Sequence, residues 1–83
     1  MYKIVIVDDD PMVAKINKIY ANSVNQVIVD QVFHDGISAL NYLKNNSVDL
    51  VILDVFMPKL NGIDLLNKNI IKNINFLMRK QKV

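Results

Sequence analysis

The chain has 83 residues, of which 52% are hydrophobic and none is cysteine. Its length limits it to one small domain, and a domain of this size buries only about 60 to 65% of its unfolded surface. The absence of cysteine excludes disulfides and thiolate metal sites. The net charge of +2 is unevenly distributed, because four lysines and seven aspartates precede Lys59, whereas five lysines and one arginine stand against one aspartate from Lys59 onward.

This distribution and the hydropathy pattern exclude several classes of protein. An acidic first part with a basic end differs from the basic stripe of a nucleic-acid-binding protein, so we expect no direct binding of nucleic acid. The sequence contains no apolar run of the roughly 18 to 20 residues that a membrane helix needs, and its N-terminus does not resemble a signal peptide. We therefore expect a cytoplasmic protein without membrane contact.

The first predicted elements are a strand and a helix. Ile4–Val7 is a continuous run of β-branched apolar residues, which is typical of a parallel strand covered on both faces. Asp10 and Pro11 match the preferred N-cap and first residue of a helix, which we expect to reach about Asn22. Its apolar face is predicted to contain residues at helical spacing, namely Met12, Ile16 and Tyr20, with Val13 alongside.

A second strand and a second helix follow. Val27–Phe33 is rich in β-branched residues, but Asp30 and Gln31 interrupt it, which favours a strand at the edge of a sheet. Asp35 and Gly36 then mark the start of a helix that ends at Asn45 and Asn46. Its apolar positions are Ile37, Leu40 and Leu43.

The last part of the chain predicts two more strands and one more helix. Leu50–Leu53 is a second fully apolar strand, and Asp54 follows it directly. Residues 57–62 are rich in turn-forming types, and the helical spacing of Ile63, Leu66 and Ile70 predicts a third helix after them. Residues 74–78 predict a fourth strand, residues 79–82 are expected to be solvated, and no repeat or linker divides the chain. We therefore expect a single domain over residues 1–83.

The alternation of strands and helices predicts a parallel α/β sheet with right-handed crossovers. The fully apolar strands should lie centrally and the interrupted strand at an edge, which gives the strand order 2-1-3-4. In such a sheet, ligands bind at the carboxyl ends of the strands where the order reverses. Asp8, Asp9 and Asp54 all follow strands that end at this crevice.

Three carboxylates at one crevice predict a metal site. Asp10 is interpreted as only the helix cap, and for Asp8 and Asp9 alone a solvated loop would be the simpler interpretation. Adding Asp54 brings three like charges together, and a cation removes their repulsion. Oxygen ligands without His or Cys, and with positions left for water and phosphate, suit Mg²⁺. Asp54, alone at the tip of its strand, is then the natural nucleophile for a phosphoryl group.

Three motifs carry a resemblance to a known family. Residues 6–11 (IVDDDP), 34–40 (HDGISAL) and 49–58 (DLVILDVFMP) with Asn61-Gly62 resemble the receiver domain of bacterial two-component response regulators. The segments DDDPMVAKIN and DVFMP look closest to the branch that senses citrate and dicarboxylates. The resemblance implies a doubly wound, flavodoxin-like fold.

The resemblance also implies roles for individual residues. Asp54 would accept phosphate from a sensor histidine kinase, Asp9 would ligate Mg²⁺ directly, and Asp8 would hold it largely through water. The backbone carbonyl of Phe56 would be a further ligand. Such a domain is not an enzyme in its own right, although it assists its own phosphorylation and dephosphorylation. His34 is interpreted as an exposed turn residue, since the phosphodonor histidine belongs to the kinase.

The sequence departs from the family towards its C-terminus. The family has five strands, a Thr or Ser after the fourth and a Lys after the fifth, whereas here the hydroxyl position falls near Arg79 and the fifth strand is absent. We therefore expect a C-terminally truncated receiver whose phosphorylation is impaired. Such a receiver would leave apolar faces uncovered and the edge of its last strand unpaired. We therefore expect a homodimer or higher oligomer, formed through these surfaces or by exchange of C-terminal segments.

Two other functions stay open. A truncated receiver could act as an interaction fragment that docks to a kinase or to intact regulators without carrying phosphate. Alternatively, Asp8 and Asp10 could be the paired aspartates of a haloacid-dehalogenase-type phosphatase, with Asp8 as the nucleophile. In that motif Gly-Thr would follow where Pro11-Met12 stands, and Asp54 would have no role.

Overall fold

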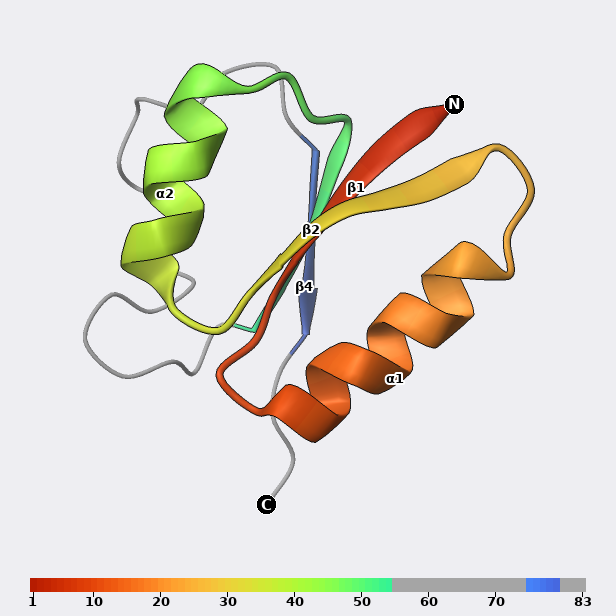
Figure 1. Ribbon diagram of the computed structural model, residues 1–83, viewed down its shortest axis with the longest axis horizontal. Helices are drawn as coiled ribbons and strands as arrows, with labels where there is room; N and C mark the ends of the chain where they lie inside the picture. The colour runs from red at the N-terminus through yellow and green to blue at the C-terminus, as the bar shows by residue number, and fades with distance from the viewer. Residues whose placement is uncertain (55–74, 80–83) are drawn as a thin grey trace.

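The computed structural model describes residues 1–54 and 75–79, which form a parallel sheet with a helix on each face (Figure 1). In chain order the elements are β1 (Tyr2–Val7), α1 (Pro11–Asn22), β2 (Val27–Phe33), α2 (Gly36–Asn45), β3 (Leu50–Asp54) and β4 (Asn75–Arg79). The strands are all parallel and lie in the order β2-β1-β3-β4. The predicted fold class and strand order are confirmed.

The two helices lie on opposite faces because the chain reverses its direction across the sheet. From β1 it moves outward to β2, and from β2 it returns past β1 to β3. Two right-handed crossovers in opposite directions place α1 and α2 on opposite sides, as Figure 1 shows. Val5 and Val7 of β1 pack in the cluster that includes α2, whereas Ile4 and Ile6 pack in the cluster that includes α1. The prediction of a strand covered on both faces is thus confirmed.

The edge strand β2 contains a bulge at its polar interruption. Ile4 pairs with Val29 and Val5 pairs with Gln31, so Asp30 is an extra residue without a partner in β1. Its carboxylate instead accepts a hydrogen bond from the Tyr42 hydroxyl of α2, which raises the pKa of Tyr42 above its ordinary value. The ring of Tyr42 also contacts Phe33, with ring centroids 5.4 Å apart. The interruption is therefore a point at which the edge strand is attached to α2.

The predicted apolar face of α1 is wrong. Pro11–Asn22 and its Asp10 cap are as expected, but Met12, Ile16 and Tyr20 are exposed and Val13 is only half-buried. The buried residues of α1 are Ala14 and Ala21. Small side chains let the helix lie close to the sheet, so the larger apolar side chains of α1 turn outward.

Other predictions are confirmed in part. In α2, Leu40 and Leu43 are buried as expected but Ile37 is exposed. Strand β1 begins two residues before the predicted Ile4, and β4 is shifted by one residue from the predicted range. The loop over residues 57–62 and the helix predicted after it lie outside the described residues. Among the described helices, none has the length and apolar character to cross a membrane.

Candidate functional site

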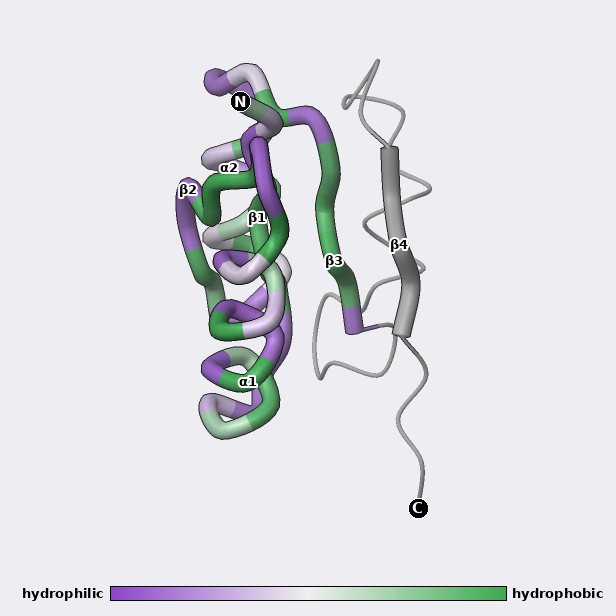
Figure 2. Tube along the Cα trace, turned by 90° about the vertical axis from the view of Figure 1, so that its right-hand side faces the viewer, coloured by the Kyte–Doolittle hydropathy of each residue, from purple (hydrophilic) through white to green (hydrophobic). Residues whose placement is uncertain are grey.

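The candidate site lies at the carboxyl ends of β1 and β3. Val7 pairs with Leu53 in the parallel register, so the next residues along the two strands, Asp8 and Asp54, reach the same edge of the sheet. Figure 2 shows β3 as an apolar strand that becomes hydrophilic at its end, next to β4. Asp9 follows Asp8 on the loop to α1. The register alone therefore brings together aspartates more than forty positions apart in sequence.

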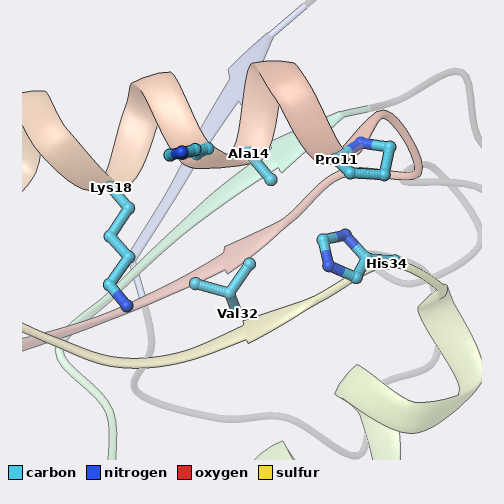
Figure 3. Close-up of a pocket in the computed structure, with 6 residues that line it drawn as sticks. Pro11, Ala14, Lys18, Val32 and His34 are labelled. Atoms are coloured by element: carbon cyan, nitrogen blue, oxygen red, sulfur yellow. The ribbon is translucent and has the colours of Figure 1, made fainter.

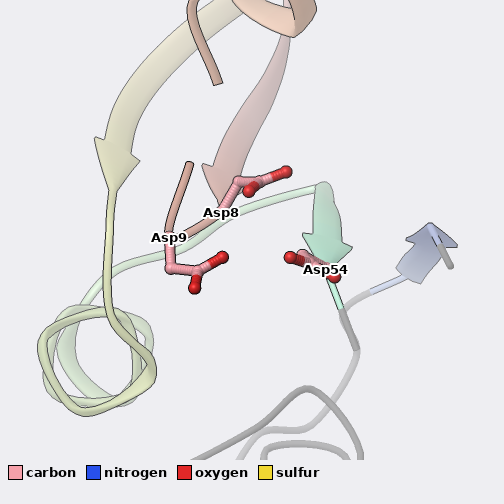
Figure 4. Close-up of side chains that lie close together, drawn as sticks. All are labelled: Asp8, Asp9 and Asp54. Carbon is pink, nitrogen blue, oxygen red and sulfur yellow. The ribbon is translucent and has the colours of Figure 1, made fainter. Parts of the chain in front are cut away.

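Asp8, Asp9 and Asp54 form one acidic cluster. One carboxylate oxygen from each lies within 4.8 Å of the others, and the side chains converge on a common space (Figure 4). Asp8 and Asp54 are each 2% exposed, whereas Asp9 is exposed to solvent. The structure thus brings together the three aspartates predicted from the sequence.

The third aspartate of the triplet, Asp10, has a different role. One oxygen of its carboxylate accepts hydrogen bonds from the backbone N–H groups of Met12, at 2.9 Å, and Val13, at 3.3 Å. These contacts cap the first turn of α1. The backbone N–H of Asp10 donates to the Asp8 carboxylate at 2.9 Å. The predicted cap is confirmed, and the same residue also orients Asp8.

Asp8 is held by backbone contacts to the end of β2. Its N–H donates to the carbonyl of Phe33 at 3.0 Å, and its own carbonyl accepts a hydrogen bond from Nδ1 of His34, also at 3.0 Å. His34 is exposed, as expected for a turn residue. Its contact with the site was not predicted, because only the parallel pairing of β1 with β2 brings it beside Asp8.

The electrostatics of the cluster favour a cation. Two carboxylates about 4.8 Å apart repel by roughly 3 kcal/mol at an effective dielectric constant of 20. Partial desolvation, the negative charge of Asp54 and a hydrogen bond with Asp54 raise the pKa of Asp9 above its ordinary value of 3.8. A divalent cation would relieve this repulsion and favour the ionised form.

The donor set fits a hard metal ion. All three groups of the cluster are carboxylates, and oxygen ligands that leave positions for water are typical of Mg²⁺ sites. Phe56, whose carbonyl was expected as a further ligand, lies outside the described residues. Arg79 pairs with Asp54 in the register of β3 and β4. The Thr or Ser that the family has after its fourth strand was expected near this residue. An arginine therefore occupies the position beside Asp54 at the end of β4.

Comparisons with known proteins agree with this arrangement. The sequence is 37% identical over 82 residues to "Probable C4-dicarboxylate response regulator DctR" of Bacillus subtilis, which covers 99% of this chain and 32% of DctR. It is also 37% identical over 68 residues to the transcriptional regulatory protein MalR of the same organism, which covers 82% of this chain and 29% of MalR. The chain thus spans about a third of the length of these relatives.

A solved structure and a family model extend the comparison. The MaeR response regulator bound to beryllium trifluoride superposes with a TM-score of 0.83 at 28% identity, over 100% of this chain and 70% of MaeR. Residues 4–75 match the family model of the response regulator receiver domain. These residues include the two clustered aspartates that directly follow β1 and the third at the end of β3. The chain therefore belongs to the family of response regulator receiver domains.

Proposed function

We propose that this chain is a phosphoacceptor signalling domain in which Asp54 receives a phosphoryl group from a sensor histidine kinase. The observation that carries the proposal is the convergence of three carboxylates within 4.8 Å at the end of β1 and β3. Membership in the receiver family supports it. A relative, MaeR, has been solved with bound beryllium trifluoride, and a tetrahedral fluoroberyllate is similar in shape to a phosphoryl group.

Each aspartate of the cluster has a separate role in this proposal. Asp54 attacks phosphorus through a carboxylate oxygen, so that an O–P bond forms as the N–P bond of the kinase phosphohistidine breaks. The residues that would hold Mg²⁺ are Asp8, Asp9, Asp54 and Phe56, the last through its backbone carbonyl. When bound, the metal neutralises charge on the transferring phosphoryl group. The backbone contacts to Asp8 keep its carboxylate in place before the ion arrives.

Three further features belong to the proposal. The domain is not an enzyme in its own right, although its site assists transfer to and from Asp54. It acts in the cytoplasm, where histidine kinases present their phosphohistidine. It also associates with a second copy, because α1 exposes Met12, Ile19 and Tyr20 to solvent and Leu50 and Ile52 of β3 are only partly buried.

Phosphorylation with a small donor tests the acceptor chemistry directly. The protein is incubated with Mg²⁺ and acetyl phosphate, and the adduct is located by intact mass and peptide mapping. We expect one phosphoryl group on Asp54, lost in Asp54→Asn and lost on removal of Mg²⁺. Asp49→Asn is the matched control, because Asp49 is an exposed aspartate outside the cluster that accepts from the Lys3 N–H at 2.8 Å, and asparagine keeps an oxygen for that contact.

The other outcomes discriminate between the alternative functions. Label on Asp8 would contradict the proposal and favour a phosphatase of the haloacid dehalogenase type. The absence of label in a folded, Mg²⁺-loaded protein would favour an interaction fragment that binds its partners without phosphate. A phosphoryl group retained in Asp54→Asn but distributed over other aspartates would indicate nonspecific phosphorylation and would equally contradict the assignment of Asp54.

A further inference from the structure

A groove separate from the acidic cluster lies between α1 and the end of β2. Its volume is about 340 Å³, within the usual range for small-molecule sites. The described residues that line it are Pro11, Ala14, Lys15, Lys18, Val32 and His34. None of the three clustered aspartates is among them. Figure 3 shows Lys18 extending from α1 towards β2, with Val32 and the ring of His34 below the helix.

The groove has cationic groups above an apolar floor. Pro11, Ala14, Lys15 and Lys18 recur at helical spacing, so they share one side of α1. α1 contains no acidic residue that could pair with its lysines. Pro11, which is exposed, and Val32, which is partly buried, supply apolar contact. A ligand that fits these walls carries a negative charge and a short hydrocarbon body.

His34 adds a hydrogen-bond acceptor to the groove. Its Nδ1 lies 3.0 Å from the carbonyl oxygen of Asp8. Since a carbonyl oxygen can only accept, Nδ1 carries the proton, and in the neutral form of the ring Nε2 is an acceptor. An acceptor at this position suits a ligand hydroxyl, whereas the two lysines suit a carboxylate.

From these groups, we propose that the groove between α1 and β2 binds a small hydroxycarboxylate. The carboxylate contacts the ammonium groups of Lys15 and Lys18, and the hydrocarbon part lies on Pro11 and Val32. The hydroxyl donates to Nε2 of His34. This site is separate from the acidic cluster, because it uses none of the three clustered carboxylates. A ligand bound there would contact His34, which also holds the carbonyl of Asp8.

Binding is tested by titrating the intact, metal-free chain with 3-hydroxybutyrate and with butyrate, followed through the backbone amide resonances. We expect saturable shifts confined to residues 11–18 of α1 and to residues 32–34, with the hydroxy acid bound several-fold more tightly than butyrate. Lys18→Gln should weaken binding by roughly tenfold, the usual effect of losing one charge-assisted hydrogen bond. Lys44→Gln, on the last turn of α2, is the matched control and should leave the affinity unchanged.

Several results would overturn the proposal. Shifts that do not saturate, or that spread equally to Lys3 and Lys44, would show only nonspecific attraction of an anion to lysines. An equal effect of Lys18→Gln and Lys44→Gln would have the same meaning. Equal affinities for the two acids would contradict the role of His34 and the ligand class. Since Lys18 is exposed, its substitution leaves the core intact, and unchanged amide resonances in β1 and β3 verify the fold of the variant.

Discussion

The two faces of the sheet are covered by their helices in different ways. On the α2 face, the buried cluster comprises Val5, Val7, Ala39, Leu40, Leu43, Val48, Val51 and Leu53. On the α1 face, the fully buried residues are Ile4, Ile6, Ala14 and Ala21, and five further apolar residues of the strands are only partly buried. Strand β1 contributes two buried residues to each face, whereas β3 contributes buried Val51 and Leu53 to the α2 face and only partly buried Leu50 and Ile52 to the α1 face. The helices differ as well. α2 packs with leucines, whereas α1 packs with alanines.

This comparison indicates a division of roles between the two faces. The α2 face concentrates large buried side chains and should contribute most of the hydrophobic stabilisation, since that term scales with apolar area removed from water. The α1 face carries the groove, the exposed apolar side chains and the N-terminal cap that adjoins Asp8. Contacts with ligands and partners are therefore expected on the α1 face.

The largest effect should come from truncating a leucine on the α2 face. Leu43 is 4% exposed, so Leu43→Ala removes buried methyl groups and leaves a cavity, which typically costs 2 to 5 kcal/mol. Ile37→Ala on the same helix is the matched control, because Ile37 is 53% exposed and surface changes usually stay within about 0.5 kcal/mol. Urea denaturation measures both values. Similar losses for the two variants would contradict the assignment of the α2 face as the main core.

The elements and the acidic cluster could be predicted from the sequence because they depend on local signals and on register. Apolar runs marked β1 and β3, and Asp10 with Pro11 marked the start of α1. Parallel pairing then required Asp8 and Asp54 to meet. The orientation of α1 could not be predicted, because its spacing fits two faces and the sheet accepts the one with alanines. The contact of His34 depends on tertiary placement beside Asp8 and has no sequence signal.

Binding of Mg²⁺ is expected to have an intermediate effect on the free energy of unfolding. If Mg²⁺ binds the folded cluster, a concentration about 100 times its Kd should stabilise the protein by roughly 2.7 kcal/mol. Asp9→Asn should abolish most of this gain because it removes a proposed direct ligand, whereas Asp49→Asn should retain it. Thermal unfolding with and without Mg²⁺ measures the difference. A full Mg²⁺ response in Asp9→Asn would show that Asp9 is not a ligand.

The same variant should change the pH dependence of stability in the absence of metal. The pKa of Asp9 is raised above 3.8 in the folded protein. At pH values between 3.8 and the folded pKa, the folded state therefore binds more protons than the unfolded state. The contribution of Asp9 to stability therefore falls as pH rises through the folded pKa. Asp9→Asn should become progressively more stable than the parent as pH rises from 3.8 through the folded pKa of Asp9. A constant difference over this range would contradict the shift.

The smallest effect on folding stability, but one specific to the α1 face, should come from Ile19. Ile19 on α1 is 59% exposed and Ile37 on α2 is 53% exposed, so replacing either with lysine should change the unfolding free energy by no more than about 0.5 kcal/mol. If two copies associate through α1, Ile19→Lys should produce monomers because the lysine charge would be desolvated in the interface. Ile37→Lys should remain associated. Sedimentation velocity at micromolar concentration measures the oligomeric state of the parent and of both variants. A parent protein that is already a compact monomer would disprove self-association, and the exposed face of α1 would then be available to a different partner.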